Sequence, residues 1–355
     1  MNTASNKKTY PKKASASAID AVDFSNLQFG RVFTDHMVVA FYKEGKWSTP
    51  KLRPYGPLPF SPAMSVFHYG QAIFEGMKAF YAEEGQSILF RPDAHYKRIN
   101  RSLSRMAMPE LPEKLFMESI RMLLKKDKAW LKRAGQLYVR PFAIAIDEGL
   151  KVKISDTYMY AVLACPVGSY FTKPLDLKIE TEYTRSAPGG VGFAKAAGNY
   201  AASMLPTREA QEEGFDQLIW TDAKTHTIIE GSGMMNIACV IRRKLVTPPA
   251  GNTILAGITR DSLLTIAPTL GIKVEERKIT VNELIKGIVS GAVTEVFGMG
   301  TAATIASCAS ITHKGKKYLL KDWGENSVAN RLFIELDSIK RGNKKAPKGW
   351  ICEIK

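Results

Sequence analysis

The chain has 355 residues, which is too long for one ordinary hydrophobic core, so two domains are expected. Hydrophobic residues make up 45% and charged residues 24%, a globular balance, and no apolar run approaches the ~18 residues that a membrane span needs. The net charge of +16 is spread along the chain without an aromatic-interleaved basic motif, so we predict neither a nucleic-acid nor a membrane partner.

Residues 1–23 are rich in lysine, serine and alanine and predict a disordered tail. A smaller N-terminal domain is expected over residues 24–165. Its predicted strands lie at 38–42, 46–47, 88–90, 137–146 and 157–165, and its predicted helices at 93–106 and 113–132. Because these strands are not separated by regular crossover helices, this half is expected to be α+β.

Residues 166–185 contain Pro166, Gly168 and Pro174, and we interpret them as the connection between the domains. A larger domain is expected over residues 186–355, and it opens with the glycine-rich run PGGVG at 188–192. Its predicted helices lie at 199–213, 259–270 and 281–287, and its predicted strands at 217–221, 227–229, 236–241, 244–247 and 292–297.

The four cysteines lie far apart and form no CxxC pair, which argues against a zinc site or a disulfide framework. Cys165, Cys239 and Cys308 stand among apolar or small residues, as buried thiols do. We therefore predict no bound metal and a reducing, cytoplasmic location.

Lys195 differs from an ordinary surface lysine because small residues surround it in the sequence, namely Gly192, Ala194, Ala196, Ala197 and Gly198. Small neighbours let a bulky group approach the backbone closely. A lysine that attacks an aldehyde must be partly desolvated so that its amine is neutral enough to react. The segment is compatible both with such a site and with a tightly packed turn.

The run KAAGNYAAS at 195–203 resembles the cofactor-lysine segment of the branched-chain amino acid aminotransferases, which are type IV pyridoxal-phosphate enzymes. Further blocks follow in the order of that family: FHYGQAIFEGMKAF at 67–80, LFRPD at 89–93, LYVRP at 137–141, ILAGITR at 254–260 and EVFGMGTA at 295–302. The resemblance implies the two-domain α+β architecture of that fold, with a smaller N-terminal α+β domain and a larger C-terminal mixed α/β, barrel-like domain. It also implies a homodimer.

The resemblance implies that Lys195 binds pyridoxal 5'-phosphate covalently and that Tyr200 hydrogen-bonds the phenolic oxygen of this cofactor. Arg91 can offer a planar fork of N–H groups to the phosphate. The amides of Gly257, Ile258 and Thr259 lead into a predicted helix and can point at an anion. In the family, the turn that contains Thr301 also binds the phosphate.

The resemblance also implies the substrates. Tyr69, Phe74 and Tyr138 resemble the aromatic lining of an apolar side-chain pocket, which suits leucine, isoleucine and valine. In the family, the turn with Thr301 and Ala302 meets the substrate carboxylate. Arg140 resembles the arginine that admits the second substrate pair, glutamate and 2-oxoglutarate. The expected activity is therefore ping-pong transamination of branched-chain L-amino acids with 2-oxoglutarate.

One stretch departs from the family pattern. The family carries a glutamate five residues before an asparagine, and this carboxylate faces the pyridine nitrogen of the cofactor. Here Glu230 lies six residues before Asn236, and Gly231 stands at the expected position. Either a one-residue bulge brings Glu230 into the role, the interpretation that we favour, or Gly231 replaces the glutamate.

These alternatives define the rival functions. If Gly231 replaces the glutamate, the protein is a cofactor-binding homologue with weak or altered activity. D-amino acid aminotransferase and aminodeoxychorismate lyase share the fold, but their chains are shorter. The long N-terminal region and the block with Tyr138 and Arg140 argue against both.

Overall fold

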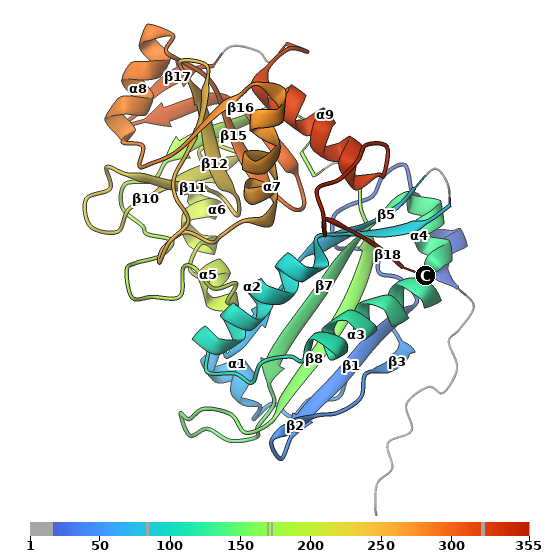
Figure 1. Ribbon diagram of the computed structural model, residues 1–355. Coiled ribbons are helices and arrows are strands. Elements are labelled where there is room, and N and C mark those ends of the chain that lie inside the picture. Colours follow the sequence, from blue (N-terminus) through green and yellow to red (C-terminus); the bar gives the residue numbers. More distant parts are fainter. Residues whose placement is uncertain (1–16, 83–84, 169, 172, 321–323, 355) are drawn as a thin grey trace, which may run out of the picture.

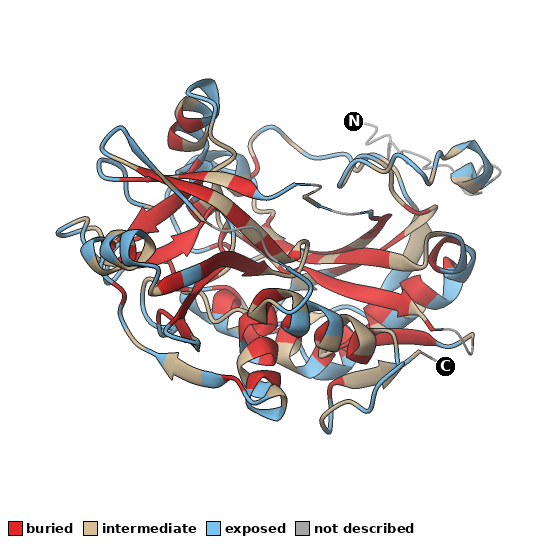
Figure 2. Cartoon of the chain, turned by 90° about the horizontal axis from the view of Figure 1, so that it is seen from above, coloured by how far each residue is buried: buried red, intermediate tan, exposed pale blue. Residues whose placement is uncertain are grey.

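The computed structural model describes residues 17–82, 85–168, 170–171, 173–320 and 324–354, which form two nine-stranded sheets with helices packed on them (Figure 1). The strands of both sheets are largely buried, whereas the outer faces of the helices are exposed (Figure 2). The α+β fold class expected from the sequence is confirmed.

The first sheet contains the strands of the N-terminal half together with the last strand of the chain. Its order is β18-β6-β5-β7-β8-β1-β2, with β3 on β1 and β4 on β7. The last strand, β18, pairs antiparallel with β6, so the C-terminal segment returns to the first sheet. The strands are β1 (His36–Lys43), β2 (Lys46–Trp47), β3 (Lys51–Pro54), β4 (Ala72–Phe74), β5 (Met77–Tyr81), β6 (Ser87–Phe90), β7 (Gln136–Ala145), β8 (Tyr158–Pro166) and β18 (Ile351–Glu353).

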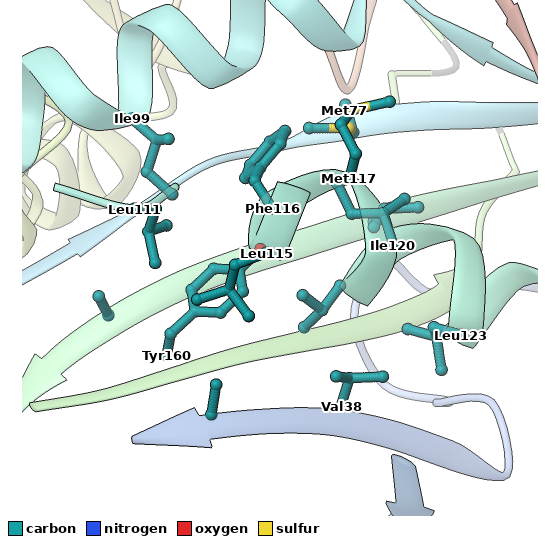
Figure 3. Close-up of a cluster of buried hydrophobic side chains, with 14 of the residues drawn as sticks. Val38, Met77, Ile99, Leu111, Leu115, Phe116, Met117, Ile120, Leu123 and Tyr160 are labelled. Atoms are coloured by element: carbon teal, nitrogen blue, oxygen red, sulfur yellow. The ribbon is translucent and has the colours of Figure 1, made fainter. Parts of the chain in front are cut away.

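Helices cover the first sheet and bury an apolar face against it. They are α1 (Ser65–Tyr69), α2 (Pro92–Arg105), α3 (Glu113–Lys126) and α4 (Lys128–Ala134). In Figure 3, Phe116 and Ile120 project from α3 toward the strands, and Ile99 of α2 joins the same cluster. These residues recur at helical spacing, which confirms the amphipathic pattern of the sequence.

The single helix predicted over 113–132 is wrong, because α3 and α4 are separated at Asp127. This carboxylate is buried and lies 2.6 Å from His36 Nδ1, and it also accepts the His36 backbone N–H at 3.1 Å. The contact with β1 fixes Asp127 at φ −100° and ψ 29°, outside the helical range. Local helical periodicity could not reveal this partner, which lies 91 residues away.

The second sheet contains the strands of the C-terminal half, in the order β11-β10-β9-β16-β15-β12-β13-β14 with β17 on β16. Its strands are β9 (Leu175–Ile179), β10 (Gln217–Thr221), β11 (Ile229–Ser232), β12 (Asn236–Ile241), β13 (Lys244–Thr247), β14 (Lys273–Glu276), β15 (Val293–Gly300), β16 (Thr304–His313) and β17 (Lys316–Leu319). The segment interpreted as a connection, 166–185, therefore includes a strand. Leu175, Leu177 and Ile179 of β9 alternate into the core between β10 and β16.

The helices of this half are α5 (Ala197–Ala201), α6 (Met204–Glu212), α7 (Ile258–Ile266), the 3-10 helix η2 (Ala267–Leu270), α8 (Val281–Ser290) and α9 (Val328–Lys340). The helix predicted over 199–213 is interrupted at Ala202 and Ser203, just before Pro206 in the first turn of α6. The helix predicted over 259–270 tightens into η2 at Pro268, since proline removes one backbone donor.

Residues 1–16 of the predicted disordered tail lie outside the described residues. The rest of that segment includes the 3-10 helix η1 (Ala18–Ala21), so the expectation of disorder to residue 23 is corrected there. Asp35 ties it to the fold by accepting Ser17 Oγ at 2.6 Å and the Ala18 N–H at 3.0 Å. Across the described part of the chain, every helix is too short or too polar to cross a bilayer.

Candidate active site

The main chain of Lys195 is held between the two halves of the molecule. Its N–H donates to Ser102 Oγ of α2 at 2.9 Å, and its carbonyl accepts the Phe74 N–H of β4 at 3.1 Å. An isolated bridge between Ile73 and Ala196 continues this pairing. The position of Lys195 is therefore fixed by elements of the first sheet, although the residue itself directly precedes α5.

The side chain of Lys195 meets two of the predicted site residues. Its Nζ donates to Tyr200 Oη at 2.8 Å and lies 4.7 Å from the centroid of the Phe74 ring. The Phe74 and Tyr200 rings contact each other with centroids 4.7 Å apart. Among the described residues, no carboxylate lies within ion-pairing distance of this partly buried amine, so it is available for covalent chemistry.

Arg140 and Tyr138 of β7 adjoin the same aromatic group. The Arg140 guanidinium carbon lies 4.5 Å from the centroid of Phe74 and 5.3 Å from that of Tyr138, and its Nη2 donates to Tyr138 Oη at 3.4 Å. The Tyr138 ring covers Gly76 so closely that a Cβ there would clash. Arg140 Nε is buried without a hydrogen-bond partner among the described residues, so this cation has capacity for an anionic ligand.

Tyr69 lies apart from this group. It ends the short helix α1, it is 40% exposed, and its hydroxyl donates to the carbonyl oxygen of Leu150 in the loop between β7 and β8. Within one chain it joins none of the ring contacts around Phe74 and Lys195. Its role in lining a substrate pocket stays a prediction that requires a second copy of the chain.

A β-bulge lies at Glu230, as favoured from the sequence. Trp220 of β10 pairs with Gly231 of β11, but the next residue, Thr221, pairs with Ile229, so Glu230 is the extra residue. A bulge bends the strand and re-aims a side chain. The physical basis for the six-residue spacing to Asn236 is therefore present.

The Glu230 carboxylate is buried and only half satisfied. Its Oε1 accepts the Thr253 hydroxyl at 2.6 Å, while Oε2 has no hydrogen-bond partner in the described part of the chain. Burial raises the pKa of Glu230, and the Thr253 hydrogen bond and the Arg185 guanidinium oppose that rise. Arg185 also interacts electrostatically with Tyr200, so one cation links Glu230 to the hydroxyl that holds Lys195.

A separate group of donors gathers at the N-terminus of α7. Gly257 caps this helix in an extended conformation, and Ile258 and Thr259 are buried behind it. The Asn236 amide approaches Gly257 so closely that no Cβ would fit, and its Nδ2 donates to the Leu255 carbonyl at 3.0 Å. Because the first amides of a helix lack internal partners, this end can bind an anion.

Two other predicted phosphate ligands flank that helix end. Thr301 lines a small cavity together with Ile258 and Thr259. Arg91 donates from Nη1 to Ser262 Oγ of α7 at 2.8 Å and pairs with Asp261 at 2.6 Å, so it lies beside the first turn of the same helix. The structure thus brings the predicted phosphate residues together at one end of α7.

Ala302 faces a different space from Thr301. It lines a cavity of about 580 Å³ that also includes Gly168, Tyr170 and Lys78. The turn that follows β15 therefore separates the larger cavity from the small one at α7.

A buried charge network behind the site was not predicted. Glu75 is fully buried and accepts Arg98 Nε at 2.6 Å and Nη2 at 2.8 Å, and His95 Nδ1 lies 2.7 Å from it. Burial acts to raise the pKa of Glu75, but Arg98 and His95 outweigh it and hold the pKa well below its usual range. Arg98 also donates to the Ala256 carbonyl at 3.2 Å, which anchors the loop before α7 to α2.

Other residues also escaped the sequence reasoning, namely Ser102, Arg185, Thr253, Lys78 and Lys340. Each acts through a contact with a segment distant in the chain. For Glu75 and Lys78 a signal was present, because both stand in the FHYGQAIFEGMKAF block that carried the resemblance. Arg185 and Thr253 stand outside every such block.

Comparisons with known proteins agree with this geometry. Residues 72–311 match the family described as amino-transferase class IV. The chain is 42% identical over 339 residues to branched-chain-amino-acid transaminase 1 of Bacillus subtilis, covering 94% of this chain and 95% of that protein. It is also 42% identical over 337 residues to the branched-chain-amino-acid aminotransferase of Mycobacterium tuberculosis, covering 92% of each.

Solved structures of similar proteins share the fold. The branched-chain aminotransferase of Thermoproteus uzoniensis with norvaline superposes with a TM-score of 0.76 at 25% identity, covering 90% of this chain and 100% of that one. A branched-chain amino acid aminotransferase in complex with N-(5'-phosphopyridoxyl)-L-glutamate, from the organism abbreviated T.th., gives 0.71 at 25% identity, covering 89% and 98%.

Proposed function

This chain belongs to the class IV aminotransferase family, and from that premise we propose that Lys195 is the residue on which its reaction depends. The reaction is the transamination of branched-chain amino acids, and the cofactor is pyridoxal phosphate. The role of Lys195 is supported above all by its partly buried amine, which lies 2.8 Å from Tyr200 Oη and has no carboxylate within ion-pairing distance among the described residues.

The residues of the site fit this cofactor. Glu230 Oε2 is a buried, unpartnered acceptor in the described part of the chain, as a pyridine N–H requires. The amides at the start of α7, with Arg91 and Thr301 beside them, suit a phosphate. Tyr200 Oη can hold both the lysine amine and a phenolic oxygen, because a hydroxyl donates once and accepts twice.

When bound, the cofactor supplies an aldehyde for amines and a cationic ring that takes up the electron pair left at the substrate α-carbon. The protein supplies the proton transfer. Lys195 Nζ, once free, takes the α-proton as general base and returns it as general acid. The Tyr200 hydroxyl orients that amine, and the Phe74 ring beside it keeps water from the amine.

The side chains around Lys195 account for two kinds of substrate. Phe74 and Tyr138 offer ring faces against which a branched apolar side chain gains by burial. Arg140, stacked on the same rings, offers its guanidinium to the side-chain carboxylate of glutamate or 2-oxoglutarate. The turn at Thr301 and Ala302 is the proposed site of the substrate α-carboxylate.

A panel of half-reactions tests the function. The purified protein is mixed with L-leucine, L-isoleucine, L-valine, L-glutamate or D-alanine, and the absorbance of the bound cofactor is recorded. Bleaching by the L-amino acids and not by D-alanine is the expected result. Bleaching by D-alanine alone would instead indicate D-amino acid transamination, and a bound cofactor that none of them bleaches would leave only cofactor binding.

We also propose a homodimer, in which an exposed apolar face is covered by a second copy of the chain. This face comprises Phe67 and Tyr69 of α1 and Leu150, Val152 and Ile154 of the loop between β7 and β8. The two segments are joined by the hydrogen bond from Tyr69 to the Leu150 carbonyl. Clustered apolar exposure of this kind is typical of protein interfaces.

Val152→Asp is expected to shift the protein from dimer to monomer in sedimentation velocity at micromolar concentration, because it buries a charge in an apolar interface. Val289→Asp is the matched control, since Val289 on α8 is 70% exposed and Val152 is 77% exposed. The control should sediment as the wild type does. A wild-type monomer, or a V152D dimer of unchanged stability on dilution, would refute this interface.

We place the protein in the cytoplasm because of its thiols. Cys165, Cys239 and Cys308 are free and buried, and burial raises the pKa of each. Thiols of this kind are inert structural residues, as is usual in a reducing compartment.

A further inference from the structure

A small cavity behind the turn at Thr301 contains a lysine to which no role has yet been given. The cavity is lined by Lys78, Phe90, His95, Ile258, Thr259, Thr301 and Lys340. Ile258, Thr259 and Thr301 are proposed phosphate residues, so this cavity adjoins the phosphate end of the cofactor site. Lys340 enters it from the last residue of α9, which is distant in sequence from every other phosphate residue.

Lys340 is buried without an anionic partner among the described residues. It is only 3% exposed, its Nζ donates to Thr304 Oγ1 at 3.1 Å, and the Phe90 ring centroid lies 5.5 Å from Nζ. Thr304 and Phe90 are neutral and compensate a buried ammonium only in part. A second buried lysine, Lys78 of β5, lines the same cavity and repels the first.

The carboxylates nearest to these lysines are engaged elsewhere. On α9, Asp337 lies beside Lys340 but pairs with Arg341 at 2.7 Å. On α2, His95 faces the cavity but is bound to Glu75, which is already paired with Arg98. Among the described residues, neither Lys78 nor Lys340 has a carboxylate within 4.0 Å. The cavity therefore has an excess of positive charge.

We propose that Lys340 is a further ligand of the cofactor phosphate, and that with Lys78 it supplies the charge that a dianion requires at this site. The inference rests on the proposed function, since it takes the N-terminus of α7 as the phosphate end of the cofactor site. A phosphate there would meet amides from α7, the Thr301 turn and an ammonium from α9. The C-terminal helix would thereby be tied to cofactor binding.

The charge of these lysines makes the binding pH-dependent. Burial, and repulsion between the two ammonium groups, lower the pKa of Lys340 to about 7, and burial lowers the pKa of Lys78 to about 8. Asp337 raises both pKa values and Arg341 lowers both, while His95 stays largely neutral because burial lowers its own pKa. A bound dianion stabilises the protonated lysines, so phosphate binding should take up protons and weaken as the pH rises above 7.

The test compares two ligands of the apoenzyme, pyridoxal phosphate and pyridoxal, which differ only in the phosphate. The ratio of their dissociation constants isolates the phosphate contribution, because Lys195 reacts with both. Lys340→Gln removes the charge and keeps a donor for Thr304. It should weaken pyridoxal phosphate by about tenfold or more and leave pyridoxal within about twofold. Lys340→Arg should retain most of the ratio, and Lys345→Gln, at an exposed position of the same segment, should retain all of it.

Equal loss of both ligands in K340Q, or no loss of either, would overturn the proposal. The wild type gives an independent check if K340Q fails to fold. From about pH 7 to about pH 9, where a phosphate monoester is already dianionic, the ratio should fall by more than about tenfold. A ratio that does not change with pH would also overturn it.

Failure of the proposed function would look different. If Lys195 did not bind the cofactor, neither ligand would label it under borohydride. Inorganic phosphate would still raise the melting temperature of the wild-type apoenzyme, and would raise that of K340Q less. The phosphate site is thus tested separately from the chemistry.

Discussion

Replacing Lys195 with alanine is expected to lower the rate of transamination by about 10⁴-fold, the upper end of what a positioned general acid–base contributes. The amine is the only described side chain that donates to Tyr200 Oη, so no neighbour stands ready to move the α-proton. Substrate half-reactions followed by absorbance measure the loss. Lys195→Gln should be equally slow, because it retains volume but not basicity.

The location of the defect distinguishes loss of chemistry from loss of fold. After borohydride treatment of the wild type, the labelled peptide should contain Lys195, and the variants should carry no label. Their phosphate site should remain intact, so inorganic phosphate should stabilise them as it does the wild type. A label on another lysine, or a variant that keeps most of its rate, would exclude Lys195 from the proposed role.

Local sequence predicts those parts of the site that lie close together in the chain. Lys195 and Tyr200 are five residues apart, and their contact arises within one turn-and-helix segment. Gly257, Ile258 and Thr259 are consecutive, so a predicted helix start already implied their anion site. In both cases the resemblance and the physical pattern pointed to the same residues.

The contacts that escaped prediction join distant segments. Arg98 reaches Ala256 across 158 residues, and Lys340 reaches Thr304 across 36. No periodicity or cap signal encodes such pairs, because they depend on how one sheet docks on the other. The break at Asp127 has the same origin, since its partner His36 belongs to another strand. Strand β9 was missed because Gly168 and Pro174 nearby suggested a connection.

The bulge at Glu230 leads to the second large effect. Glu230→Gln is expected to slow transamination by about 10²-fold, as when one preorganised electrostatic contact is removed. The amide is isosteric and can still accept the Thr253 hydroxyl, so the fold should persist. What it loses is the negative charge at Oε2, the buried oxygen left without a partner among the described residues. Single-turnover rates with L-leucine measure the effect on proton transfer directly.

Gly231→Ala separates the two alignments left open by the sequence. A Cβ at Gly231 would lie 3.1 Å from the Met235 carbonyl oxygen, so the strand must yield only slightly and the rate should fall modestly. If Gly231 occupied the position facing the pyridine nitrogen, Glu230 would be an outer neighbour and E230Q would be nearly as fast as the wild type. That result would sink the proposed role of Glu230.

The pH profile adds a readout that a merely structural residue would not move. Burial raises the pKa of Glu230, so its carboxyl becomes neutral at a higher pH than an ordinary glutamate does. A neutral carboxyl cannot stabilise a cationic ring, and the wild-type rate should therefore fall on the acid side as the pH drops through that raised pKa. Removing the Arg185 charge, as in Arg185→Gln, should move this limb to higher pH, because the guanidinium favours the ionised carboxylate. In E230Q the limb itself should disappear, since glutamine does not titrate, and an unchanged acid limb would assign the titration to another group.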